Sequence, residues 1–142
     1  MARLEPTRSN ASSSSPSRLN IASGSPFEEV FGYCRAVRVG NTVHVAGTCA
    51  AQDQLDGTDT YTQAVSALAI IQTALAEAGT GPESVVRTIT YVTNIDDMEQ
   101  VAKAHFEVFG SVRPAATLVE VSRLIDPRMT IEIEAYAVIA DD

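Results

Sequence analysis

The sequence predicts a single α+β domain in which two helices cover one face of a mixed β-sheet. The length of 142 residues suits one domain, which buries about two thirds of the surface of its unfolded chain. Two segments carry apolar residues at helical spacing, and much of the remaining chain consists of β-branched or alternating runs. The expected order is hairpin, helix, strand, helix, strand, strand. Right-handed crossovers in that order place both helices on the same face of the sheet.

The composition excludes several classes of protein. Hydrophobic residues make up 45% of the chain, and no apolar run approaches the ~20 residues that a membrane-spanning helix needs. We therefore expect a soluble protein with no membrane partner. The formal net charge is −8, which repels a phosphate backbone, so nucleic acid is not an expected partner.

The first part of the chain, residues 1–17, is expected to be a disordered leader, and residues 18–142 form the expected domain. The leader contains the run Ser12–Ser15 and almost no apolar residue, so burial cannot offset the entropy of ordering it. It also lacks the apolar core of a secretory signal. The expected location is therefore the reducing cytoplasm.

The domain is expected to open with a β-hairpin. Its strands are Arg35–Val39 and Thr42–Ala46, joined by a two-residue turn at Gly40-Asn41. Cys34 and Cys49 lie just outside these strands without metal-ligand or CxxC spacing. We expect them to be free thiols with a packing role rather than a redox role.

The two histidines of the chain, His44 and His105, fall in different expected elements. They form neither an HxH nor an HExxH pattern, so the sequence predicts no metal site. The chain also has no glycine-rich nucleotide-binding loop and no nucleophilic-serine motif. We therefore expect no cofactor, and a serine hydrolase is not indicated.

Residues 57–79 are predicted to form the first helix. Thr58 or Asp59 can cap its start, apolar residues recur at helical spacing along it, and Gly79 suits a left-handed end. Many of its residues are alanine, which allows close packing against a sheet.

A strand is predicted after this helix, at residues 85–93, because that segment is rich in β-branched residues. Asp96 followed by Glu99 resembles a capping box and is expected to open the second helix. That helix is expected to end at Gly110.

The C-terminal segment, residues 110–140, is predicted to be a hairpin of two strands around the turn Asp126-Pro127. In its second strand, isoleucine and alanine alternate with Glu132, Glu134, Tyr136 and Val138. The face that carries these four residues has no cover within the chain and is more apolar than a solvent face requires. Self-association is expected to bury it.

The paired carboxylates on this face have two open interpretations. Glu132 and Glu134 fit a solvated or salt-bridged surface, which is the common arrangement on an antiparallel sheet. Alternatively, a neighbouring chain buries Glu132, and desolvation then makes it an acid–base group.

Several segments together resemble the RidA/YjgF family. They are Gly32 to Asn41, Ala46-Gly47-Thr48, Val86-Arg87-Thr88 with Tyr91-Val92, and Arg113-Pro114-Ala115 through Val119 to Leu124 and on to Ile131 to Ala135. The resemblance runs from about Ser23 to Ile139. It implies a chorismate-mutase-like α+β fold that assembles as a homotrimer with small-molecule clefts between subunits. It also implies hydrolysis of enamine or imine intermediates, made by pyridoxal-phosphate enzymes, to 2-oxo acids and ammonia.

The resemblance also assigns site residues. In the family, a glutamate of the Ile-Glu-Ile-Glu run positions water, and this position is Glu132. The tyrosine and glycine that line the cleft fall on Tyr33 and Gly47. The arginine that holds the substrate carboxylate falls on Ala116, and a methyl group cannot replace a guanidinium in that role. The implied ligand-binding positions are therefore Tyr33, Gly47, Ala116, Thr117 and Leu118, with Glu132 as the catalytic residue.

The substitution at Ala116 resembles a branch of the family that lacks this arginine and is not expected to act as the standard deaminase. Arg113 and Arg123 lie nearby, but strand alternation puts both on the face opposite to Ala116. They are expected to form salt bridges rather than to bind substrate.

Three functions remain open. The first is hydrolysis of an imine or another small electrophile through a water that Glu132 positions. The second is binding or sensing of a small metabolite without turnover. The third is the endoribonuclease activity that some relatives are named for, which the charge of −8 makes the least favoured. The presence of Glu132 favours the first, and Ala116 favours the second.

Overall fold

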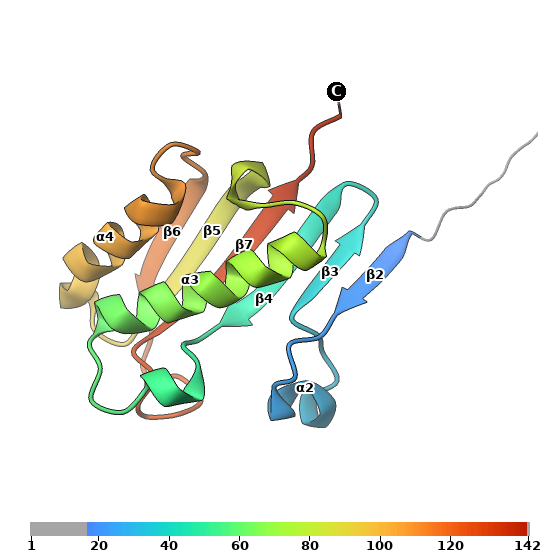
Figure 1. The fold of residues 1–142 in the computed structure, drawn as a ribbon. Helices are drawn as coiled ribbons and strands as arrows, with labels where there is room; N and C mark the ends of the chain where they lie inside the picture. The colour runs from blue at the N-terminus through green and yellow to red at the C-terminus, as the bar shows by residue number, and fades with distance from the viewer. Residues whose placement is uncertain (1–16, 142) are drawn as a thin grey trace, which may run out of the picture.

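The computed structural model describes residues 17–141, and these form one six-stranded mixed sheet with two long helices on one face (Figure 1). This confirms the predicted fold class. Apart from Ser17, the expected leader lies outside the described residues. The strands are β2 (Arg18–Ile21), β3 (Ala36–Val39), β4 (Thr42–Thr48), β5 (Val85–Val92), β6 (Ala115–Glu120) and β7 (Ile131–Val138). The helices are α2 (Pro26–Phe31), α3 (Thr60–Glu77) and α4 (Met98–Phe109), with short 3-10 turns at η2 (Gln52–Gln54), η3 (Pro82–Ser84) and η4 (Ile95–Asp97).

The strands lie in the order β2-β3-β4-β7-β5-β6. All neighbouring pairs are antiparallel except β5 and β6, which are parallel and joined through α4. The first hairpin is confirmed, because β3 and β4 pair with Val39 opposite Thr42. Gly40 in its turn has a φ of 57°, which glycine adopts without a steric penalty.

The predicted C-terminal hairpin is wrong. β6 and β7 are both strands, but β5 lies between them and pairs with each. The crossover through α4 returns the chain parallel to β5, so β6 takes the edge next to β5. The connection 121–130 then has to reach the far side of β5, which a tight turn cannot do. Arg128 within this connection forms ion pairs with Asp126 and Asp56.

Helix α3 confirms the first predicted helix. The Asp59 carboxylate accepts a hydrogen bond from the Thr62 amide at 2.8 Å, which caps the helix and lowers the pKa of that carboxyl group. Gly79, with a φ of 92°, follows its end. Its inner face packs on β4 and β7, and the buried apolar residues there are Ala64, Ala67, Leu68, Ile71, Ala74 and Leu75.

Helix α4 starts later than the sequence indicated. The cap is the Asn94 side chain, which accepts from the Asp96 amide at 2.9 Å and begins the 3-10 turn η4. The α-helix follows at Met98 without a side-chain cap. The predicted capping box at Asp96 and Glu99 is therefore wrong, because an asparagine two residues earlier satisfies the first free amide.

The segment before the first hairpin carries structure that the sequence analysis did not assign. Strand β2 pairs with β3 at the edge of the sheet. Helix α2 begins where the Ser25 hydroxyl accepts from the Phe27 amide, has Pro26 in its first turn and ends at Gly32, with a φ of 82°. A serine cap, a proline and a final glycine are a known signature of a short helix.

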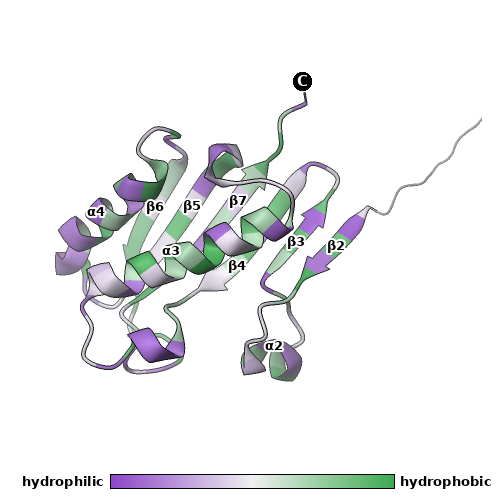
Figure 2. Ribbon diagram, in the orientation of Figure 1, coloured by the Kyte–Doolittle hydropathy of each residue, from purple (hydrophilic) through white to green (hydrophobic). Residues whose placement is uncertain are grey.

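No helix among the described residues covers the second face of the sheet. Figure 2 shows hydrophobic colour along β6 and β7 and more hydrophilic colour on β2. On β5, Thr88, Thr90 and Val92 are buried under the helices, and the residues between them face outward. The exposed apolar residues at the strand surfaces include Val86, Val119 and Val138, at 48%, 39% and 47% exposure.

Candidate functional site

The Glu132 carboxylate lies directly against the backbone of Gly47. Glu132 projects from the uncovered face of β7, since its neighbours Ile131 and Ile133 are buried under the helices. A Cβ added at Gly47 would lie 2.0 Å from Glu132 Oε2, so only glycine leaves room for this carboxylate. The pairing of β4 with β7 shifts register between Val45 and Thr48, a bulge that brings Gly47 to this position.

Cys49 supplies a donor to the same carboxylate. Its Sγ lies 3.6 Å from Glu132 Oε1. Burial, followed by the charge of Glu132, raises the pKa of the Cys49 thiol to about 12. The thiol is therefore protonated at neutral pH, and it donates to Glu132 rather than acting as a nucleophile.

Arg35 is a buried cation beneath this site, with 6% of its surface exposed. Its Nη1 donates to the Gly47 carbonyl at 2.7 Å and to Thr48 Oγ1 at 2.9 Å. Its Nη2 donates to the Tyr33 hydroxyl at 2.9 Å. Arg35 therefore fixes the two residues, Tyr33 and Gly47, that the sequence placed beside Glu132.

Glu28 on α2 pairs with this cation. Its Oε2 lies 3.9 Å from Arg35 Nη2, and both side chains are buried. The Glu28 carboxylate also accepts from the Ser23 amide at 3.2 Å. The pair ties the segment around α2 to the end of β4 and balances the buried charge of Arg35.

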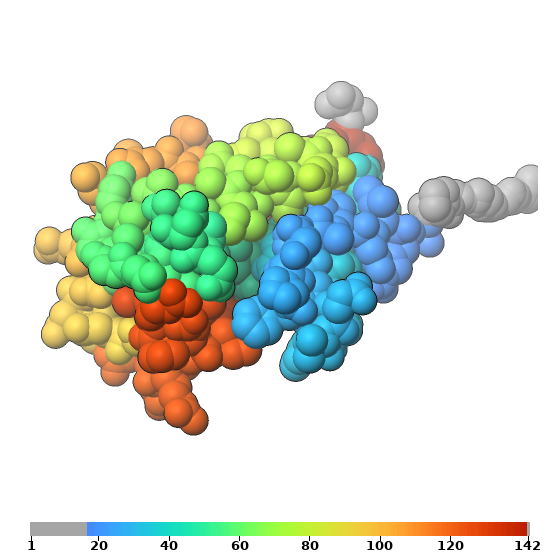
Figure 3. Space-filling view, turned by 60° about the horizontal axis from the view of Figure 1, so that its bottom comes forward, coloured from blue at the N-terminus to red at the C-terminus, as the bar shows by residue number. Residues whose placement is uncertain are grey.

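A groove of about 1130 Å³ runs along these residues. Figure 3 shows it between the N-terminal segment, in blue, and the segments coloured green and orange-red. Its walls come from residues 21–35, the end of β4 with the following turn, and the second half of α3. Tyr33, Arg35, Gly47, Cys49 and Glu132 all line it. The structure thus brings together three of the sequence-predicted site residues.

The other three predicted site residues lie elsewhere. Ala116, Thr117 and Leu118 are on β6, which β5 separates from β7, and none of them lines the groove. Ala116 is exposed and pairs with the buried Thr88, so it points to the helix-covered side of the sheet. Thr117 points to the uncovered side, and Leu118 packs against the core. Within one chain, these positions do not contact Glu132.

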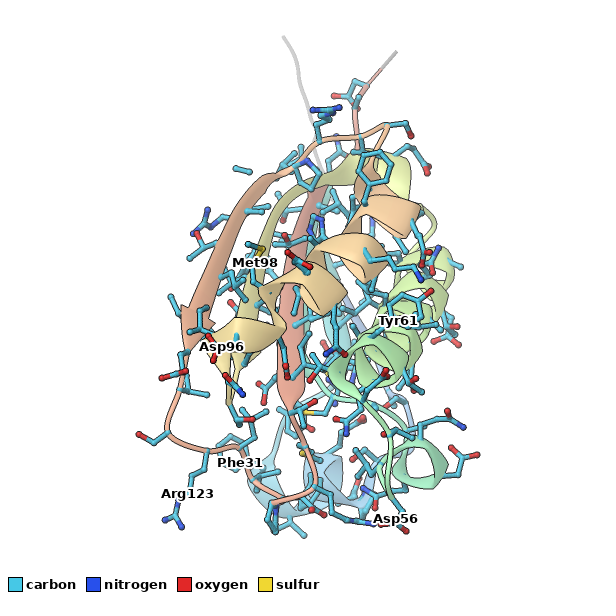
Figure 4. The ribbon with its side chains drawn as sticks, turned by 90° about the vertical axis from the view of Figure 1, so that its left-hand side faces the viewer. Phe31, Asp56, Tyr61, Asp96, Met98 and Arg123 are labelled. Carbon is cyan, nitrogen blue, oxygen red and sulfur yellow. The ribbon has the colours of Figure 1, made fainter. Side chains whose placement is uncertain are left out.

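The two arginines near Ala116 do not reach the groove either. Arg123 is exposed in the connection after β6, and Figure 4 shows it directed away from the body of the protein. Arg113 has a φ of 62°, so its backbone is not extended and strand alternation does not apply there. Its Nε donates to the Gly110 carbonyl at 3.2 Å.

The second carboxylate of the run, Glu134, is held in a separate network on the uncovered face. Tyr91 donates to its Oε2 at 3.0 Å, and Tyr136 donates to its Oε1. The bond to Glu134 raises the pKa of Tyr136 to about 12. The His44 ring meets the Tyr136 ring edge to face at 5.5 Å. Each oxygen of Glu134 therefore accepts from one phenol, whereas Glu132 has the thiol of Cys49 alone as a side-chain donor within the described chain.

His105 and the two cysteines show no metal-binding arrangement. His105 Nε2 lies 2.8 Å from Thr88 Oγ1, and burial lowers the pKa of the ring. Both cysteines are free thiols. Within residues 17–141, no group of three or more histidine, cysteine or acidic side chains could hold a metal ion. In the same region, no helix has the length and apolar character needed to cross a membrane.

Sequence reasoning missed Arg35, Glu28 and the role of Cys49. Arg35 falls within a strand pattern that alternates, and an arginine there fits an exposed position. No sequence signal distinguishes a buried arginine from an exposed one when its partner lies in an unassigned helix. For Cys49, the contact with Glu132 depends on the bulge in β4, which the spacing of residues along the chain does not reveal.

The sequence of the chain matches a known protein family. Residues 25–139 match the family model described as Endoribonuclease L-PSP. An uncharacterised protein of Streptomyces coelicolor is 46% identical over 120 residues, covering 82% of this chain and 90% of its own length. A RutC family protein of Pyrococcus abyssi is 33% identical over 109 residues, covering 74% and 84%.

The fold matches solved structures of the same kind. A Mycobacterium tuberculosis protein described as a member of the YjgF/YER057c/UK114 family superposes with a TM-score of 0.81 at 44% identity, covering 87% of this chain and 100% of that one. The chain therefore belongs to the RidA/YjgF family, whose family model carries the description Endoribonuclease L-PSP.

Proposed function

We propose that this protein hydrolyses a small imine-like electrophile, with Glu132 positioning the attacking water. The observation that carries the proposal is the placement of the Glu132 carboxylate in the groove against Gly47, where no side chain separates them. A carboxylate in a groove can accept a proton from water as the water attacks an electrophilic carbon. Cys49, which is a neutral donor, holds one oxygen of that carboxylate and leaves the other available.

The reaction balances without a cofactor. Water adds to the carbon of a protonated C=N bond, and Glu132 takes the proton that the water loses. Glu132 returns this proton to the nitrogen of the resulting carbinolamine and takes the hydroxyl proton as the C–N bond breaks. The departing ammonia picks up that second proton, so the products are a carbonyl compound and an ammonium ion. The hydroxyl of Tyr33, which Arg35 fixes in place, lies at the same groove and can orient the substrate.

A homotrimer is part of this proposal. The uncovered sheet face carries exposed valines and a preformed Glu134 network, and a second copy is the natural cover for it. Family membership supports the same assembly. Ala116, Thr117 and Leu118 do not contribute to the groove of their own chain, so in the proposed cleft they come from a neighbouring copy.

A second candidate is a binding or sensing protein without turnover, and Ala116 is the observation that favours it. The carboxylate-binding arginine of the family is absent at this position. Neither Arg113 nor Arg123 lines the groove. Ribonuclease activity, which the family model names, has less support, because the net charge of −8 repels a phosphate backbone.

The experiment that separates these candidates is a hydrolysis assay with imines generated in place by an amine or amino-acid oxidase. The proposal expects ammonia to appear faster in the presence of the protein. The variant Glu132→Gln should lose this acceleration, and the variant Glu29→Gln, which removes an exposed charge from α2 outside the groove, should retain it. Equal rates of ammonia release with the wild type and with Glu132→Gln would contradict the proposed hydrolase function.

A further inference from the structure

The charges that line the groove are mainly negative. Of the described residues along it, Glu132 and Glu77 carry carboxylates, and Arg35 is the one cation. Glu28, which pairs with Arg35, adds a further negative charge just behind the wall. An anionic ligand would therefore meet repulsion in this groove, and a cationic ligand would meet attraction.

Arg35 is not available as a receptor for an anion. Both of its terminal nitrogens are engaged, Nη1 with Gly47 and Thr48 and Nη2 with the Tyr33 hydroxyl. Its Nε has no partner, but that atom is buried and cannot meet a ligand. The guanidinium thus holds the wall residues of the groove in place and does not bind a ligand in it.

The rest of the groove is apolar. Residues of α2 contribute Phe27, Val30 and Phe31, and the last of these is 82% exposed. Ile70 on α3 and Met129 before β7 also line it. Exposed aromatic and aliphatic side chains on a short helix are costly in water, and they favour a ligand that covers them. A volume of about 1130 Å³ accommodates a ligand much larger than an imine with a two- or three-carbon body.

We infer that the substrate class of this groove is a protonated imine with an apolar body and without a carboxylate, the kind of imine that forms when an apolar primary amine is oxidised. The inference rests on the proposed function for the reaction, and on the charges and walls of the groove for the class of ligand. The cationic nitrogen lies at Glu132, and the apolar body lies along α2 and Ile70.

The hydrolysis of such a cation needs only water and the Glu132 carboxylate. Water and the protonated imine give an apolar aldehyde or ketone and an ammonium ion. The charge leaves nitrogen when water adds, and it returns when Glu132 delivers to nitrogen the proton that the water lost. Both protons of the water end on the departing nitrogen, so atoms and total charge are conserved. The reaction that supplies the substrate must therefore be an amine oxidation rather than an amino-acid elimination.

The test uses three probes that share one apolar body and differ in charge: phenethylammonium, phenethyl alcohol and phenylacetate. Calorimetric titration of the full-length protein at pH 7 should rank them in that order, with the cation bound at least tenfold more tightly than the anion. The variant Glu132→Gln should weaken the cation by about tenfold or more, because it removes a charge-assisted contact, and should leave the alcohol nearly unchanged. Ile70→Ser should weaken all three probes, and Glu29→Gln should weaken none.

The outcomes separate this inference from the proposed function. Preferred binding of phenylacetate, or no binding of any probe, would overturn the class of ligand. If imine from phenethylamine is hydrolysed faster than imino acid from phenylalanine, both the inference and the proposed function hold. If the imino acid is the better substrate, the inference fails although the protein is a hydrolase. If the cation binds as expected and neither imine is hydrolysed faster than in buffer, the inferred ligand class is supported and the proposed hydrolase function is contradicted.

Discussion

Gly47 and Glu132 share a space that holds only one side chain: a Cβ at Gly47 would stand 2.0 Å from Glu132 Oε2. The Gly47→Ala variant should therefore move the carboxylate while the strand survives, since the far end of a glutamate shifts easily. We expect the rate of imine hydrolysis to fall about 100-fold, because a displacement of about 1 Å in a catalytic group typically costs that much. The melting temperature should change little. Steady-state kinetics and thermal unfolding measure the two effects.

Gly81→Ala is the matched control for this variant. A Cβ there would lie 2.6 Å from the Glu83 carboxylate, in a turn away from the groove. It should shift its glutamate in the same way and leave turnover intact. Equal activity of Gly47→Ala and wild type would show that the position of Glu132 does not matter for the reaction.

Ala116→Arg restores the family's cation at a position that a neighbouring copy is proposed to supply to the cleft. We expect tighter binding of 2-oxo acids, by roughly tenfold or more, because a charge-assisted hydrogen bond contributes about 1.5–3 kcal/mol where it is partly shielded from water. Calorimetric titration measures the change. Adding Glu132→Gln should abolish any turnover gained and leave this binding in place.

The control for this position is its neighbour. Ala115 is also exposed but lies on the opposite face of β6, since it pairs with Arg87 where Ala116 pairs with Thr88. The Ala115→Arg variant adds the same charge on the face that is proposed to contact a neighbouring copy. Trimeric Ala115→Arg protein, isolated by size-exclusion chromatography, should not show improved binding. Similar gains in both variants would point to a general electrostatic effect and against a specific cleft.

The thiol of Cys49 should resist alkylation at neutral pH. Its pKa is raised to about 12, so almost no thiolate is present until the solution is strongly alkaline. Iodoacetamide labelling followed by mass spectrometry at pH 7 to 9 should modify Cys34 before Cys49. The variant Glu132→Gln should speed the labelling of Cys49 only modestly, because burial is the larger cause of the raised pKa.

The same shift has a consequence for stability. The ordinary pKa of the thiol is 9.0, so between pH 9 and about 12 the unfolded chain releases this proton and the folded chain keeps it. The free energy of unfolding should therefore fall as pH rises through that window, and the contribution of Cys49 should vanish in Cys49→Ala. A pH dependence that is identical in wild type and in this variant would contradict the assignment.

The uncovered sheet face should carry the subunit contact. The Val119→Glu variant places a charge on an apolar residue of β6 that is 39% exposed, and it should shift the protein from trimer toward monomer in light scattering. Val65→Glu makes the same change at a residue of α3 that is 43% exposed on the helical side. The Val65→Glu variant should stay trimeric. Dissociation of both variants would contradict a subunit contact that is confined to the uncovered sheet face.

The periodic elements were predictable because they depend on local patterns. The apolar spacing of α3 and its cap at Asp59 are visible in the sequence, as are the turn at Gly40 and the alternation of β7. The pairing of β6 with β7 was mispredicted because neighbours in the chain are the usual partners in a sheet. The crossover through α4 overrides that tendency, and no local pattern in the sequence indicates it.

The candidate site was predictable only in part. The family resemblance placed Tyr33, Gly47 and Glu132, and the structure brings these three to one groove. Glu28 and Arg35 were not predicted as site residues, because their contact joins α2, a helix that the sequence analysis did not assign, to the start of β3. Long-range pairs of this kind depend on the folded topology, which spacing along the chain does not encode.

The central position of β7 sets a condition on how the protein can fold. β7 follows the other strands in the chain, yet it lies between β4 and β5 and joins the two halves of the sheet. During synthesis, β4 and β5 have no hydrogen-bonded neighbour on that side until β7 leaves the ribosome. The nascent chain therefore exposes two open strand edges, which are prone to aggregation, and a chaperone that holds them until release should raise the yield of native protein.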